Sequence, residues 1–304
     1  MLTCGVDGGG TGSRLEIWDD EGIKSGRYTF GPFNHLSIGE AAFRERLAEI
    51  LATCGDISRY DGICIGAAGA SSPRAREIVQ EVLTSTGFRG SLVFRADHEI
   101  ALRGAFDGPG AVLIAGTGSA ACGCDAEGKT IAMGGNGHLI DDEGSGYALG
   151  KYGIRLALRD LCGQEEHAAI RDAILREARV RDRSGLIGYV YGAGADKSRV
   201  ARMSRPVLRL AREGCPEAAA ITERGADELS SLARAMCGRL ALTRPRVALT
   251  GGLLDHDEYY YSLVAERVKG FAEPVRPAHD ALWGAAMTAR EAVASGAVTK
   301  TGRG

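Results

Sequence analysis

The chain opens with two short segments in which apolar and polar residues alternate, the pattern of half-buried β-strands. The segments are residues 2–7 and 13–18, and the glycine-rich stretch Asp7-Gly8-Gly9-Gly10-Thr11-Gly12 joins them. Two strands with so short a glycine-rich connection form a hairpin. This connection is not the strand-to-helix turn of a dinucleotide fold, and it therefore argues against a Rossmann site.

Helical and strand patterns then alternate. Apolar side chains recur at helical spacing over residues 41–52, and short apolar runs at 62–66 and 91–96 flank a second predicted helix at 74–84. Strands that alternate with helices belong to parallel sheets. The first part of the chain is therefore predicted to be α/β, with a parallel portion of sheet.

Near residue 105 the strand pattern starts again. Residues 111–115 predict a strand, residues 116–119 a Gly/Thr turn, and residues 120–124 and 129–133 another hairpin. Both halves of the chain thus begin with strand, turn, strand, as expected of a duplicated fold.

The remainder is mainly helical. Helical patterns fill residues 144–242, with a predicted interruption at the Gly/Ala-rich segment 185–194. A last strand at 247–250 ends in Gly251-Gly252, and a closing helix over 281–294 is predicted to return to the first lobe.

Composition narrows the class of protein. A chain of 304 residues exceeds what one core usually supports, roughly 250–300 residues, so two lobes are expected. The formal charge of −2 includes no basic block, which argues against nucleic-acid and anionic-membrane partners. No apolar run approaches the roughly 20 residues of a membrane span, and no leader pattern precedes the first strand, so a cytoplasmic protein is expected.

The cysteines and histidines do not suggest a metal centre. None of the eight cysteines has CxxC spacing, and Cys122 and Cys124, on one face of a strand, are expected to be small buried thiols. His35, His98 and His138 do not form a spaced metal-binding set.

Two turns carry chemistry suited to phosphate. Successive backbone N–H groups without side chains can surround a phosphate group, and the Asp7 carboxylate could bind Mg²⁺ directly or through water. Either turn alone could be a plain hairpin, but a matched pair could hold a polyphosphate from two lobes. The candidate residues are Asp7, Gly8, Gly9, Gly10, Thr11 and Ser13 in the first turn, and Gly116, Thr117, Gly118 and Ser119 in the second. Gly251 and Gly252, after a third strand, offer bare backbone on which a flat ring could lie.

The three turns, in this order, resemble the phosphate-1, phosphate-2 and adenosine motifs of the ATPase superfamily that includes actin, the 70-kDa heat-shock chaperones and the sugar kinases. Residues 134–146, GGNGHLIDDEGSG, resemble the GGxGxxxxDEGS signature of the N-acetylglucosamine kinases and their BadF/BadG/BcrA/BcrD relatives. The resemblance implies an α/β, two-lobed actin-like ATPase with duplicated ribonuclease H-like βββαβαβα lobes and an ATP cleft between them. The first lobe would be 1–105, completed by a C-terminal helix in 285–304, and the second 106–284, with hinges near residues 105 and 283.

The resemblance also implies roles for individual residues. Asp97, after the strand 91–96, would be the base that deprotonates the attacking hydroxyl; a solvated loop carboxylate is the alternative. Adenosine would lie on Gly251 and Gly252. Residues 142–145 could instead simply begin a helix. The predicted sugar ligands are Asn34, Gly135, Asn136 and Asp142.

The predicted function is ATP- and Mg²⁺-dependent phosphorylation of an amino sugar, N-acetylglucosamine or glucosamine, with a homodimer expected from the family likeness. Gly12 stands where a Lys is frequent in the family, and Asn136 and His138 stand where an aromatic residue is frequent. Two alternatives stay open. One is a BadF-type ATPase that acts on a protein partner or a non-sugar substrate, and the other is an actin-type sensor or filament protein.

Overall fold

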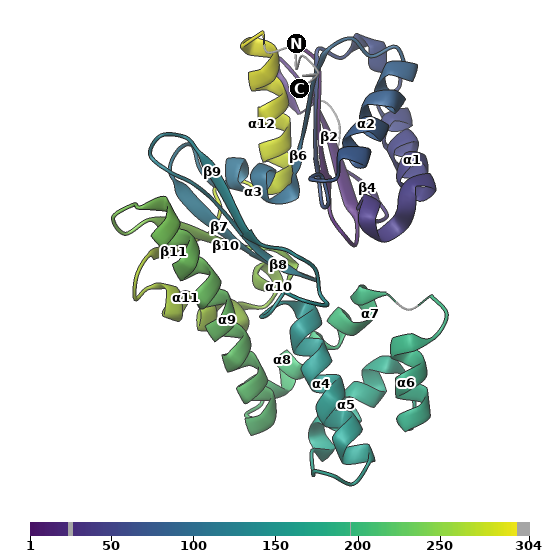
Figure 1. Cartoon of the computed structure of the whole chain (residues 1–304), viewed down its shortest axis with the longest axis vertical. Helices are drawn as coiled ribbons and strands as arrows, with labels where there is room; N and C mark the ends of the chain where they lie inside the picture. Colours follow the sequence, from purple (N-terminus) through teal and green to yellow (C-terminus); the bar gives the residue numbers. More distant parts are fainter. Residues whose placement is uncertain (24–26, 195, 297–304) are drawn as a thin grey trace. The chain divides into compact units, whose positions relative to one another are not determined.

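The computed structural model describes residues 1–23, 27–194 and 196–296, and the chain divides into two compact α/β units (Figure 1). Unit 1 is Met1–Asp107 with Pro277–Gly304, and unit 2 is Gly108–Arg276. The sequence analysis predicted that the chain passes from the second lobe back to the first between residues 284 and 285, whereas it returns to unit 1 at residue 277. His279 N donates to Gly104 O at 2.9 Å, which ties this segment to unit 1. Residues 297–304 of the predicted C-terminal segment lie outside the described residues.

Unit 1 contains a six-stranded sheet in the order β3-β2-β1-β5-β6, with β4 paired to β2. The β1–β2 pair is the predicted antiparallel hairpin, and β1, β5 and β6 run parallel, as the alternation of strands and helices predicted. The strands are β1 (Thr3–Gly8), β2 (Ser13–Asp19), β3 (Gly22–Ile23), β4 (Tyr28–Phe30), β5 (Gly62–Ala67) and β6 (Ser91–Ala96). The short strands β3 and β4 were not predicted, because two or three residues show no periodicity.

Helices cover both faces of this sheet (Figure 1). On one face, α1 and α2 pack over an apolar cluster in which the rings of Phe33 and Phe43 stack at 4.2 Å. On the other face, α3 and α12 enclose a smaller cluster of Cys64, Ile100 and Ala285. The elements are α1 (His35–Thr53, kinked at Gly39), a 3₁₀ turn at Ile57–Arg59, α2 (Pro73–Ser85), α3 (Asp97–Ala105) and α12 (Ala281–Ala294).

The closing helix α12 is held to unit 1 by close backbone contact. A Cβ at Gly5 of β1 would lie 2.4 Å from Ala286 N, and one at Gly284 would lie 2.0 Å from Ile100 O of α3. Only glycine leaves room for approaches this close. The sequence prediction that this helix returns to the first lobe is confirmed.

Unit 2 is built on a five-stranded sheet in the order β11-β10-β7-β8-β9. Strand β7 pairs antiparallel with β8 and parallel with β10, so the predicted strand–turn–strand opening is again present. The strands are β7 (Gly110–Ala115), β8 (Ser119–Cys124), β9 (Thr130–Gly134), β10 (Arg246–Thr250) and β11 (Glu273–Val275). On β8, Cys122 is buried as predicted, whereas Cys124 is half-buried.

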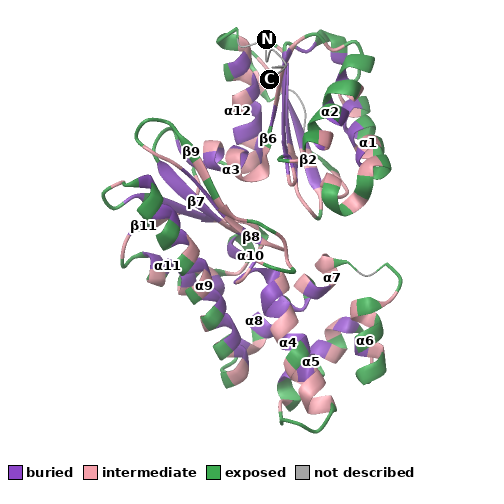
Figure 2. Ribbon diagram, viewed as in Figure 1, coloured by how far each residue is buried: buried purple, intermediate pink, exposed green. Residues whose placement is uncertain are grey.

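The helices of unit 2 share one large apolar core with its sheet, drawn in purple in Figure 2. They are α4 (Gly146–Leu161), α5 (Ala168–Ala178), α6 (Arg183–Tyr191), α7 (Lys197–Arg202), α8 (Ser204–Arg212), α9 (Pro216–Leu240), α10 (Gly252–His256) and α11 (Glu258–Val268). None of the helices in the described part of the chain is long and apolar enough to cross a membrane.

The predicted interruption at residues 185–194 is wrong, because α6 occupies most of that segment. The Asp182 carboxylate accepts a hydrogen bond from Gly185 N at 2.8 Å and caps the helix. Leu186 anchors it to the core as a fully buried side chain. One good cap and one anchored apolar residue offset the low helix propensity of glycine.

Two glycines in helix interiors give a matched test of the α12 packing. Gly284→Ala is expected to lower stability by about 1–3 kcal/mol, since its methyl group would collide with the α3 backbone. Gly238→Ala in α9 meets nothing within 4 Å and is expected to raise stability by about 0.5–1 kcal/mol. Urea titrations followed by circular dichroism would measure both changes. A stabilised Gly284→Ala protein would contradict the packing described for α12.

Candidate functional site

In unit 1, the predicted site residues follow the carboxyl ends of three parallel strands. The register sets Gly8, Ala67 and Ala96 side by side at the ends of β1, β5 and β6. In open α/β sheets, ligands bind at this edge. The glycine turn follows β1, Asp97 follows β6, and Asn34 forms a β-bridge with Ala68, directly after β5.

The first turn is tightly organised. Gly9 N donates to Gly12 O at 2.9 Å and closes the hairpin, and Gly9 O accepts from Phe33 N at 3.0 Å. A Cβ at Gly8 would lie 2.5 Å from the Phe33 ring, which explains why this position has no side chain. Gly10 and Thr11 lie at the tip of the turn, where Gly10 is partly exposed and Thr11 is exposed.

The Asp7 carboxylate is paired with an arginine that the sequence analysis missed. Asp7 Oδ2 accepts from Arg14 at 2.6 Å, and Arg14 also reaches Asp280 at 3.3 Å. Burial raises the pKa of the Asp7 carboxyl, the Arg14 guanidinium offsets part of that rise, and the negative charges of Asp97 and Asp280 add to it. Asp7 and Arg14 are directly opposed in the hairpin register, so the pair could have been found from the hairpin alone.

The donor set at Asp7 suits a magnesium ion that takes most of its ligands from elsewhere. Arg14 occupies one carboxylate oxygen. The described residues contain no group of three or more His, Cys, Asp or Glu side chains that could hold a metal ion. Mg²⁺ commonly binds through one or two carboxylates together with substrate phosphates and waters. Asp7 therefore fits as a single carboxylate partner, direct or through water.

Asn34 has two available functions, and the structure shows one of them. Its Oδ1 accepts from Leu36 N at 3.0 Å and caps α1. Its Nδ2 has no partner among the described residues. A Cβ at Gly69 would lie 2.8 Å from Asn34 Oδ1, so glycine at 69 makes room for this side chain. The polar-turn interpretation and the ligand interpretation are therefore compatible.

Asp97 is the first residue of α3, a helix that the sequence analysis did not predict. Its Oδ1 accepts from His98 N at 3.0 Å, and its side chain is 40% exposed. Glu99 caps the helix start by accepting from Ala96 N at 3.0 Å. Because Glu99 performs that task, the Asp97 carboxylate keeps an oxygen free for other partners.

In unit 2, the predicted turn 116–119 is in direct contact with loop 134–146, which contains three of the predicted sugar ligands. Gly116 N donates to Gly118 O at 2.9 Å and closes the turn between β7 and β8. Gly146 N donates to Gly116 O at 2.8 Å, and Ser119 Oγ donates to Glu143 O at 2.9 Å. The glycine turn and loop 134–146 therefore form one unit of structure.

Asp142 lies at the centre of this contact and is only 4% exposed. Its Oδ1 accepts from Ser119 N at 3.0 Å, and a Cβ at Gly118 would lie 2.7 Å from its Oδ2. Its φ of 64° is left-handed, which Asp and Asn tolerate better than most residues. Burial raises the pKa of the Asp142 carboxyl, and the Ser119 N–H opposes that rise. In this structure Asp142 positions the glycine turn.

The exposed part of the loop contains the other two predicted sugar ligands. Gly135 N donates to Ser119 O at 3.0 Å with a left-handed φ of 71°. Asn136 is held by Asp141, whose Oδ2 accepts from both the backbone N and Nδ2 of Asn136, at 3.1 and 2.8 Å. Asp141 is a second residue that the sequence analysis missed. Its sequence signal is weak: it is one Asp in a glycine-rich loop, a setting in which Asp side chains commonly accept hydrogen bonds from nearby backbone.

The third predicted turn adjoins the second. Strands β7 and β10 are parallel, so their ends lie at one edge of the sheet. A Cβ at Gly116 would lie 3.5 Å from Gly252 N. Gly251 has a φ of 101°, and its Cβ would lie 2.6 Å from Ala115 O, so a side chain is excluded there. Asp255 accepts from Gly251 N at 3.1 Å and fixes the turn.

Comparison with known proteins is consistent with this arrangement. The model of the BadF/BadG/BcrA/BcrD ATPase family matches residues 4–289. The chain belongs to this family. A relative from Clostridium acetobutylicum, an N-acetylmuramic acid/N-acetylglucosamine kinase, is 31% identical over 265 residues, which are 84% of this chain and 87% of the relative. The N-acetyl-D-glucosamine kinase of Dictyostelium discoideum is 24% identical over 88% of this chain and 90% of its own length.

Solved structures give the same fold. A protein of Chromobacterium violaceum assigned as an N-acetylglucosamine kinase has a TM-score of 0.79 at 25% identity, covering 94% of this chain and 98% of its own. A glucokinase from Streptomyces griseus, solved with glucose and an ATP analogue, has a TM-score of 0.59 at 17% identity, covering 96% and 100%. The family and the actin-like sugar-kinase fold predicted from the sequence are confirmed, and the predicted enzyme class, an ATP-dependent carbohydrate kinase, agrees with these relatives.

Asp142→Asn tests the burial of this carboxylate. Asparagine keeps the acceptor for Ser119 N and tolerates the left-handed backbone. The raised pKa means that the Asp142 carboxyl holds its proton more tightly in the folded protein than in the unfolded chain. This group therefore lowers the stability of the folded protein as pH rises above 3.8, the ordinary pKa of an aspartate. The stability of Asp142→Asn relative to the natural protein is therefore expected to increase from about pH 4 to pH 7. Urea midpoints at both pH values measure it, and a difference that does not change with pH would contradict the interpretation.

Proposed function

We propose that the protein is an ATP-dependent kinase that phosphorylates an amino sugar, N-acetylglucosamine or glucosamine. The observation that carries the proposal is the edge of the unit 1 sheet. There, a glycine turn, an asparagine with an unused amide donor and a half-exposed aspartate lie at the ends of three parallel strands that are in register. These are the groups that a kinase needs for a phosphate, a sugar hydroxyl and a proton.

The nucleotide is assigned to the glycine turns. In unit 1, the phosphates are assigned to the turn 8–13, whose exposed tip is Gly10 and Thr11, and Asp7 would contribute a carboxylate to the magnesium ion. In unit 2, residues 116–119 form the second phosphate turn, and Gly251 and Gly252 give the adenosine a side-chain-free surface. Bound Mg²⁺ would neutralise charge on the phosphates during transfer.

Asp97 is assigned as the base. It accepts the proton of the sugar hydroxyl as that oxygen forms a bond to the γ-phosphorus, while the bond from this phosphorus to the departing ADP oxygen breaks in line. Phosphoryl transfer depends mainly on positioning and charge stabilisation, so a weak base such as a carboxylate is sufficient. The first turn of α3 fixes its backbone, and its side chain remains accessible.

The sugar is assigned to Asn34 in unit 1 and to Gly135, Asn136 and Asp142 in unit 2. Asn34 donates through Nδ2, and the exposed backbone of Gly135 and Asn136 allows a ring to approach closely. Asp142 has a double role in this proposal, since it also holds the phosphate turn through Ser119.

The test is a coupled ADP-release assay with Mg-ATP and a panel of glucosamine, N-acetylglucosamine, N-acetylmannosamine, glucose and no sugar. ADP release is expected to rise with one amino sugar. In Asp97→Asn, kcat is expected to fall about 10²–10⁴-fold while ATP binding persists, because the variant keeps the shape but loses the base. An unchanged kcat would remove Asp97 from this role. A sugar-independent ATPase rate would favour a family member that acts on a protein partner.

Asn34 allows its capping and ligand roles to be separated. Asn34→Asp keeps a good helix cap but loses the amide donor, so its stability is expected to stay within about 0.5 kcal/mol of the natural protein while the sugar KM rises about tenfold. Asn34→Ala loses both functions and is expected to cost about 1 kcal/mol of stability as well. An unchanged KM in Asn34→Asp would leave Asn34 as a cap alone.

A further inference from the structure

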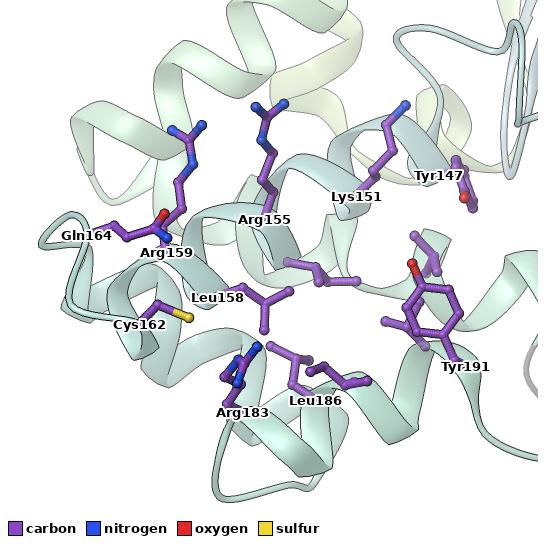
Figure 3. A pocket seen from close by; sticks show the side chains of 14 residues that line it. Tyr147, Lys151, Arg155, Leu158, Arg159, Cys162, Gln164, Arg183, Leu186 and Tyr191 are labelled. Atoms are coloured by element: carbon purple, nitrogen blue, oxygen red, sulfur yellow. The ribbon is translucent and has the colours of Figure 1, made fainter.

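Unit 2 contains a pocket that belongs to none of the turns described above (Figure 3). Its volume is about 430 Å³, within the range of about 300–1,000 Å³ typical of small-molecule sites. It is lined mainly by α4 and α6, and its lining residues on α4 run from Tyr147 to Arg159, roughly 18 Å at the rise of an α-helix. The pocket shares no lining residue with the sites assigned to ATP and sugar.

The inner surface of the pocket is apolar. Leu186 is fully buried and Ile154 nearly so, and Leu158 and Val190 complete the wall. At the α6 side, Ile187 is 37% exposed and Tyr191 is 82% exposed, which is unusual for large apolar side chains. An apolar wall with exposed members beside it suits the hydrocarbon part of a ligand.

The rim of the pocket is basic. Lys151, Arg155 and Arg159 follow one another at four-residue intervals on α4, and Arg183 comes from the first turn of α6. In Figure 3, the charged ends of the three α4 side chains point away from the apolar centre. Like charges four residues apart repel and weaken a helix. No Asp or Glu is among the lining residues themselves.

Two of the four cations have no protein partner. Arg159 pairs with Glu165 at 2.6 Å, and Lys151 lies 3.6 Å from Glu143. Arg155 and Arg183 have no ion pair or hydrogen bond within the part of the chain that the structure describes. Two unpaired guanidinium groups around an apolar pocket are complementary to an anion attached to an apolar body.

We propose that this pocket binds a small amphiphilic organic anion, with its apolar body between α4 and α6 and its carboxylate or phosphate head at the basic rim, to which Arg155 and Arg183 contribute from opposite sides. Binding would supply the counter-charge that Arg155 and Arg183 lack. The site is independent of sugar phosphorylation, so its existence does not rest on the proposed kinase activity.

The probe is anilinonaphthalene sulfonate, which has an anionic head on an apolar body and becomes fluorescent in apolar surroundings. Saturable binding at one site per chain is expected. The double variant Arg155→Gln/Arg183→Gln is expected to bind it about tenfold more weakly, from the loss of charge-assisted hydrogen bonds. Arg239→Gln is the matched control, because Arg239 is exposed on α9 and lies outside the pocket. Thermal melting of each variant confirms that it is folded.

A second readout locates the probe. Cys162 is exposed and lines the pocket, so bound probe is expected to slow its alkylation by a maleimide, measured by peptide mass spectrometry. Competition separates the possible head groups. Octanoate or octyl phosphate should displace the probe, whereas octyltrimethylammonium, with the same chain and a cationic head, should not.

Three results would overturn the proposal. They are equal probe affinity in the double variant and in Arg239→Gln, an unchanged rate of Cys162 alkylation, and displacement of the probe by Mg-ATP, which would place it at the nucleotide turns. Displacement by octanoate or by octyl phosphate would support the proposal and would identify which head group the arginines prefer. Failure of the kinase assay would leave all of these outcomes unaffected.

Discussion

The candidate site depends on the register of parallel strands. In unit 1, the ends of β1, β5 and β6 are fixed opposite one another by backbone hydrogen bonds, and in unit 2 the ends of β7 and β10 are fixed in the same way. Whatever follows these strands is brought to one edge of its sheet, however far apart it lies in the sequence. A shift of one residue in a single strand would move its side chains to the opposite face and separate these groups.

Glycine makes this edge chemically useful, because backbone comes close to backbone and to side chains there. Gly8 lies against the Phe33 ring, Gly118 against the Asp142 carboxylate, and Gly251 against the Ala115 carbonyl. A methyl group at any of these positions would collide with its neighbour. The same absence of side chains leaves N–H groups accessible to a phosphate. Close packing requires glycine at these positions, and binding of a phosphate would favour it as well. For this reason, the glycine clusters at the strand ends indicated the candidate site.

Much of the fold was predictable from the sequence because its signals are local. The β1–β2 hairpin, the second strand–turn–strand segment and the closing helix α12 were all visible as periodicity bounded by glycine. Helix α6 was not, since its glycines resemble a loop and its stability comes from the Asp182 cap and the buried Leu186. Helix α3 was missed because Asp97, its first residue, was interpreted as a catalytic or loop carboxylate after the strand 91–96.

The residues that the sequence analysis missed in the site share one property: they act on another side chain. Arg14 pairs with Asp7, and Asp141 holds Asn136. Sequence motifs identify residues that are expected to contact a ligand. They do not identify residues that only orient those ligand-contacting side chains. The buried Asp142 also acts on another part of the site, although the sequence did identify this residue as a candidate. Its motif position predicts a contact with sugar, and the hydrogen bond from Ser119 N shows that it shapes the turn 116–119.

In the kinase that we propose, the contact between loop 134–146 and the turn 116–119 would couple the affinities for sugar and nucleotide. Loop 134–146 reaches the turn 116–119 through Asp142 and continues directly into α4, whose Tyr147 N donates to Thr117 O at 3.1 Å. A sugar that reorganises this loop must therefore displace groups that also hold the second phosphate turn. Sugar and nucleotide would then bind with a mutual dependence arising within unit 2 itself. By thermodynamic linkage, that dependence has the same magnitude whichever ligand binds first.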